Sequence, residues 1–121
     1  MTRKYMLPPD VDSIGAARRH VREMLGPRTD ADTLSRAELI VSELITNSVR
    51  HGPPQPITLR LSVNEDGGVG GEIADQGNAV VAIREQRRGG VGGLGLVVVD
   101  QVSSAWGVHS GSTQVWFRVD P

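Results

Sequence analysis

The spacing of apolar residues changes from helical to strand-like partway along this chain. Over Asp32–Arg50 they recur every three or four residues, which predicts an amphipathic helix that ends at the His-Gly-Pro-Pro sequence of His51–Pro54. The segment Asp12–Leu25 has the same spacing and stops at Gly26-Pro27. From Ile57 onward apolar and polar residues alternate, so two helices precede the first predicted strands.

The rest of the chain predicts four strands and one further helix. Ile57–Val63 and Val69–Ile73 alternate on either side of a turn, as do Ala105–His109 and Gln114–Val119. Leu94–Val102 fits a strand by its valines and a helix by its apolar spacing, and we favour the helix. These elements predict an α+β fold, a two-layer sandwich of a mixed, mostly antiparallel sheet covered on one face by three helices.

The composition excludes several classes of protein. A chain of 121 residues that is 38% hydrophobic suits one core, so residues 1–121 are predicted to form a single domain. Thirteen Lys and Arg against fourteen Asp and Glu lack the basic excess of a direct nucleic-acid binder. No cysteine is present, which excludes disulfides and thiolate chemistry and favours a cytoplasmic location. No stretch is apolar enough over sufficient length to predict a membrane span.

A carboxylate and a carboxamide lie one turn apart in the second predicted helix. Glu43 and Asn47 are four residues apart, so they share one face of that helix. A carboxamide oxygen can bind Mg²⁺ that also holds waters and phosphate oxygens, and a nearby carboxylate can accept a hydroxyl proton. The pair fits a phosphate-transfer site, and it equally fits an ordinary polar pair on a solvated helix surface.

Glycines gather in the second half of the chain. Ten of the fifteen lie between Gly67 and Gly95, and the run Gly89–Leu96 leads into the third predicted helix. Backbone amides at such a helix start can approach phosphate closely, whereas a flexible linker would have the same composition. The residues between Asp75 and this run have no regular apolar spacing and predict a mobile loop, whose Arg87 and Arg88 could contact phosphate or only solvent.

Asp75 closes a predicted strand and precedes Gln-Gly. A carboxylate at a strand end could accept a hydrogen bond from the amino group of a base. Asp before a glycine is also common in turns, so the position by itself leaves both interpretations open.

Taken in order, these motifs resemble the GHKL, or Bergerat-fold, ATPases, and within them the anti-sigma-factor serine/threonine-protein kinases, which have a histidine kinase-like ATPase domain. Glu38–Gly52 resembles the N-box of that family, Ile73–Gly77 its G1 box, Gly93–Leu96 its G2 box and Thr113–Phe117 its last strand. The resemblance covers nearly the whole chain and implies the Bergerat ATP-binding fold. In the G1 box the family's usual second glycine is replaced by Ala79, whose methyl group restricts the backbone.

The resemblance also implies two cofactors, ATP and Mg²⁺. Asn47 would hold Mg²⁺ against the phosphates, Glu43 would be the catalytic base, and Asp75 would accept a hydrogen bond from the adenine amino group. The other nucleotide-binding positions it implies are Gly77 at the base pocket, Gly93, Leu94, Gly95 and Leu96 at the phosphates, Thr113 beside the adenine, and residues 78–92 as the ATP lid.

Three functions follow as alternatives. The family resemblance implies a regulator that phosphorylates serine or threonine on an antagonist protein and sequesters a sigma factor. The first alternative is a non-catalytic ATP-binding partner-switch module that sequesters a protein partner, and the second is an α+β domain that binds no nucleotide. Association of two copies into a homodimer is a further implication of the resemblance.

Overall fold

The computed structural model describes residues 1–76, 93–109 and 113–121. In chain order its elements are β1 (Thr2–Leu7), α1 (Asp12–Leu25), a short 3-10 helix η1 (Gly26–Arg28), α2 (Ala31–His51), β2 (Ile57–Val63), β3 (Val69–Ala74), α4 (Gly93–Val102), β4 (Ala105–Val108) and β5 (Val115–Val119). The three predicted helices are confirmed to within one residue at each end. The four predicted strands are confirmed as well, again to within one residue.

One strand, β1, was not predicted. Five of its six residues are exposed or half-buried and only Leu7 is buried, so the segment lacks the apolar alternation that marks a strand with one face on a core. It pairs with β2 along its whole length, from Thr2 opposite Ser62 to Leu7 opposite Ile57. This segment is a strand because it pairs with β2, and its own sequence does not indicate that pairing.

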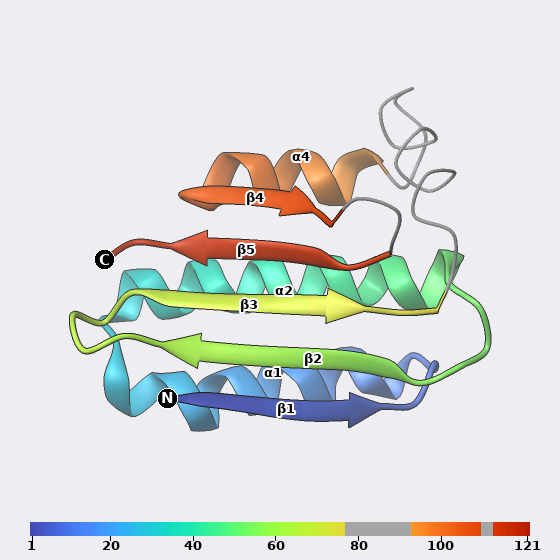
Figure 1. The fold of residues 1–121 in the computed structure, drawn as a ribbon, viewed down its shortest axis with the longest axis horizontal. Coiled ribbons are helices and arrows are strands. Elements are labelled where there is room, and N and C mark those ends of the chain that lie inside the picture. The colour runs from blue at the N-terminus through green and yellow to red at the C-terminus, as the bar shows by residue number, and fades with distance from the viewer. Residues whose placement is uncertain (77–92, 110–112) are drawn as a thin grey trace.

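The five strands form one sheet in the order β1-β2-β3-β5-β4 (Figure 1). Each of the four neighbouring pairs is antiparallel. Strands β3 and β4 run in the same direction, but β5 lies between them, so the described strands include none of the parallel pairs that a mixed sheet would contain. The α+β architecture is therefore confirmed, with an antiparallel sheet.

All three helices lie on the same side of the sheet (Figure 1). Alternate residues of β2 are buried against them, because successive side chains of a strand point to opposite faces. Helix α2 presents Ala37, Ile40, Val41, Leu44 and Ile45 to this core, all of them at most 3% exposed. No described helix covers the other face of the sheet. None of the helices in the described parts of the chain has the length and apolar content that crossing a bilayer requires.

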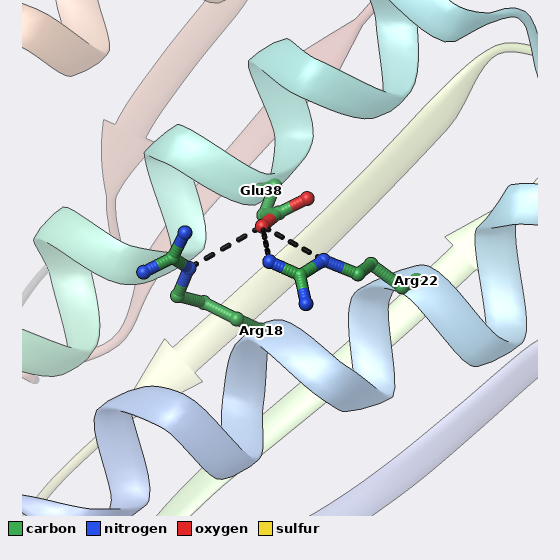
Figure 2. Close-up of polar contacts among 3 residues, drawn as sticks. All are labelled: Arg18, Arg22 and Glu38. Carbon is green, nitrogen blue, oxygen red and sulfur yellow. Dashed lines mark hydrogen bonds and ion pairs between the residues drawn. The ribbon is translucent and has the colours of Figure 1, made fainter.

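Two arginines of α1 hold Glu38 of α2 across the helix pair (Figure 2). Arg22 donates to Glu38 Oε1 from Nε at 3.0 Å and from Nη2 at 2.6 Å, and Arg18 Nε donates to the same oxygen at 3.3 Å. The hydrogen bond from Arg22 is the main reason that the pKa of Glu38 lies below its ordinary value. This contact joins α1 to the helix that carries Glu43 and Asn47.

Both ends of helix α2 are capped by the residues that flank it in the sequence. At its start the Asp30 carboxylate accepts a hydrogen bond from the Thr33 amide at 2.7 Å. That hydrogen bond also lowers the pKa of Asp30. At its end the Gly52 amide donates to the Ser48 carbonyl at 2.9 Å. The helix is therefore regular through Asn47 up to His51.

Candidate functional site

Four element ends lie on one side of the molecule. The end of α2, the end of β3, the beginning of β5 and the beginning of α4 all lie at the right of Figure 1. Asn47 is in the last turns of α2, Asp75 directly follows β3, and Thr113 lies just before β5. Candidate residues that are far apart in the sequence are therefore carried to the same end of the fold.

Glu43 and Asn47 lie one turn apart on α2, and both are half-buried. Their neighbours Leu44 and Ser48 are buried, which fixes the rotation of the helix about its axis. Helix α2 also packs against α4. Glu43 and Asn47 therefore lie beside the buried stripe of α2 and not on its fully solvated face. This is the expected place for helix positions that directly neighbour buried ones.

Asp75 is held from two directions. The Thr113 hydroxyl donates to its backbone carbonyl oxygen at 2.5 Å, which ties the end of β3 to the start of β5. Its carboxylate lies against the backbone at Gly52, where a β-carbon would be only 2.9 Å from Asp75 Oδ2. This second contact was not predicted, because a glycine directly after a long helix indicates only where the helix ends.

The glycine-rich G2 segment begins a helix. Helix α4 starts at Gly93, so Gly93, Leu94 and Gly95 form its first turn. The first amides of a helix have no partner within it and are oriented to bind anions. Leu96 is 8% exposed and belongs to the core, so its side chain anchors α4 and only its backbone is available to a ligand.

Several predicted positions lie outside the described residues. These are Gly77, Ala79, the predicted lid at residues 78–92, and with it Arg87 and Arg88.

The donor groups fit a magnesium ion that is shared with phosphates. Among the residues that the structure describes, no group of three or more His, Asp and Glu side chains could hold a metal ion. A magnesium ion bound at Asn47 would have the neutral oxygen of its carboxamide as a ligand, together with phosphate oxygens and waters. Mg²⁺ that accompanies a nucleotide usually keeps several waters and takes one or two protein oxygens, most often carboxylates, besides phosphate oxygens, and a single carboxamide oxygen is compatible with this pattern.

Comparison with known proteins agrees with this architecture. The sequence matches the family described as Histidine kinase-like ATPase domain over residues 7–119. A solved structure with a similar fold is the crystal structure of the RsbU and RsbW domains of Rv1364c from Mycobacterium tuberculosis, with 18% sequence identity and a TM-score of 0.71. That similarity covers 98% of this chain and 31% of the other, so this chain spans under a third of its length. No curated protein matches this sequence.

Proposed function

This chain belongs to the histidine kinase-like ATPase domain family, and from that premise we propose that it binds ATP with Mg²⁺ and acts as an anti-sigma-factor-like regulator. One observation carries the nucleotide part of the proposal. The last turns of α2, the residue after β3 and the first turn of α4 share one end of the molecule. These three elements carry Asn47, Asp75 and the G2 glycines respectively.

Each of these groups has a separate role in the proposed complex. Asp75 accepts a hydrogen bond from the amino group of adenine, and its main chain is steadied by Thr113. The backbone amides at the start of α4 donate to phosphate oxygens. Asn47 supplies one oxygen to Mg²⁺, which when bound neutralises charge on the phosphates. Gly77 would shape the base pocket.

The proposed reaction is transfer of the γ-phosphoryl group of ATP to a serine or threonine hydroxyl of an antagonist protein. Glu43 accepts the proton that leaves this hydroxyl as its oxygen bonds to phosphorus, and ADP departs. The position of Glu43 one helical turn from Asn47 supports this role. In the regulatory cycle, the unmodified antagonist releases a sigma factor that the protein otherwise sequesters.

A second candidate function is a non-catalytic switch module that binds ATP and sequesters a protein partner. Ala79 favours it, because a methyl group in the G1 box changes the backbone freedom of the base pocket relative to the family pattern. The similarity to a structure that contains an RsbW domain supports protein partners for either function. A cytoplasmic location and a homodimer complete the proposal.

Thermal unfolding with increasing Mg-ATP tests nucleotide binding. A ligand that binds only the folded state stabilises it by about 2.7 kcal/mol at one hundred times its dissociation constant, which raises Tm by several degrees. The part of this rise in Tm that depends on Mg²⁺ is the part that EDTA abolishes. Asn47→Ala should lose most of that Mg²⁺-dependent part. Ser35→Ala, on the exposed first half of the same helix, is the matched control and should behave like the wild type. A wild-type Tm that does not respond to Mg-ATP would reject the nucleotide function.

Labelled ATP then separates the two candidates. Incubation with candidate antagonist proteins should transfer label to a serine or threonine if the protein is a kinase. Nucleotide binding without any labelled protein would support the switch module instead.

A further inference from the structure

Gly52 ends α2 in a conformation that does not require glycine. Its φ is −80° and its ψ is 169°, an extended backbone that any residue can adopt. Its amide donates to the Ser48 carbonyl, which a larger residue could also do. The reason for a glycine at this position must therefore be space rather than backbone freedom.

The space at Gly52 is taken by two groups. A β-carbon there would lie 2.5 Å from the Ser48 carbonyl oxygen, 2.9 Å from Asp75 Oδ2 and 3.1 Å from Asp75 Cγ. The Ser48 carbonyl belongs to the last turn of α2 and is held by the helix. The Asp75 carboxylate is the end of a side chain, so it is the group that can move away when the space is filled.

We propose that Gly52 is a positioning residue: the missing side chain lets the Asp75 carboxylate lie against the end of α2, and this position sets the preference for adenine. The inference rests on the proposed function, in which Asp75 accepts the hydrogen bond of the adenine amino group. Thr113 holds the backbone carbonyl of Asp75, and the absence of a side chain at Gly52 leaves the space in which its carboxylate lies.

The substitution Gly52→Ala should change base selectivity rather than affinity alone. Inosine triphosphate has a carbonyl oxygen where ATP has the amino group, so a well-placed carboxylate favours ATP over it. A hydrogen bond to a charged group corresponds to a preference of about tenfold or more. We expect the wild type to show this preference in calorimetric titrations with the two magnesium nucleotides, and Gly52→Ala to reduce it to within about threefold of equal binding.

Gly107→Ala on β4 is the matched control. A β-carbon there would also be crowded, at 2.9 Å from Trp116 Nε1 compared with 2.5 Å from the Ser48 carbonyl oxygen at Gly52, and it lies outside the candidate site. This variant should change Tm and keep the wild-type ratio of the two dissociation constants. A Gly52→Ala protein that also keeps the wild-type ratio overturns the inference. Failure of the wild type to bind either nucleotide would instead reject the proposed function.

A second measurement needs no nucleotide and remains useful if Gly52→Ala is poorly stable. In the Asp75→Ala background the clash of the new methyl group with the Asp75 carboxylate is gone and only the one with the Ser48 carbonyl is left, so Gly52→Ala should lower Tm less there than in the wild type. If Gly52→Ala lowers Tm equally in both backgrounds, the clash with the Ser48 carbonyl alone accounts for the loss of stability. That result would overturn the positioning role.

Discussion

Arg22 donates hydrogen bonds from two guanidinium nitrogens to a single carboxylate oxygen of Glu38, at 3.0 and 2.6 Å, across the interface of α1 and α2. Glu38 is the first residue of the N-box string, and its side chain is only 18% exposed. The same helix meets Asp75 at its other end through Gly52. Helix α2 is thus fixed at the start of this string by α1 and at its end by β3, and Glu43 and Asn47 lie between the two contacts.

Removing the charge of Glu38 should lower stability in a pH-dependent way. The arginines hold the pKa of the folded carboxyl below that of the unfolded chain, which is about 4.3. The stabilisation is therefore complete above the unfolded value and is lost as pH falls through the folded value. Thermal unfolding of the wild type and Glu38→Gln should differ at pH 7, and the two should converge on acidification.

Added salt should reduce this difference at pH 7, because both arginines are about half exposed. Asp32→Asn is the control, because the Asp32 carboxylate that pairs with Arg36 is 74% exposed. It should change Tm less. A difference between wild type and Glu38→Gln that grows toward low pH would contradict the assigned role.

Truncation of Ile40 should destabilise the domain strongly. Its side chain is fully buried on the core face of α2, so Ile40→Ala removes apolar contacts and leaves a cavity, at a cost of about 2–5 kcal/mol. The neighbouring Leu39 is 41% exposed, and Leu39→Ala should cost no more than about 0.5 kcal/mol. Urea unfolding measures both. Similar midpoints for the two variants would be inconsistent with the described packing.

Loss of the Thr113 hydroxyl should loosen the end of β3. Thr113→Val keeps the shape of the side chain but removes the hydrogen bond to the Asp75 carbonyl, for an expected loss of about 0.5–1.5 kcal/mol of unfolding free energy. Mg-ATP should also raise Tm less in this variant. Thr58→Val is the control, because it removes a hydrogen bond from the Thr58 hydroxyl to the Met6 sulfur, at 3.4 Å, and sulfur is a weak acceptor. An unaffected Thr113→Val protein would argue against this support of Asp75.

Substitution of Glu43 should separate binding from chemistry. Glu43→Ala should keep the Mg-ATP-dependent rise in Tm and lower phosphoryl transfer by about a hundredfold or more, because it removes the proposed base and leaves Asn47 in place. Phosphorimaging of labelled antagonist protein measures the transfer. Glu65→Ala, in the exposed turn between β2 and β3, should transfer at the wild-type rate. Equal transfer by Glu43→Ala and the wild type would reject the role of Glu43.

The sequence by itself determined the elements whose pattern is local. Helices α1, α2 and α4 and the strands β2 to β5 were predictable because each shows its own apolar spacing, and these elements implied the two-layer α+β fold. The pairing of Glu43 with Asn47 on one helix face was predictable for the same reason, since four residues make about one helical turn.

Only the tertiary structure decided how distant segments meet. The mostly polar segment Thr2–Leu7 becomes a strand by pairing with β2, and β5 inserts between β3 and β4 although it follows both in the chain. The contacts between Arg22 and Glu38 and between Gly52 and Asp75 arise in the same way. The apolar periodicity of an element indicates which of its faces is buried. It does not indicate which other element packs against that face, because this depends on residues far apart in the chain.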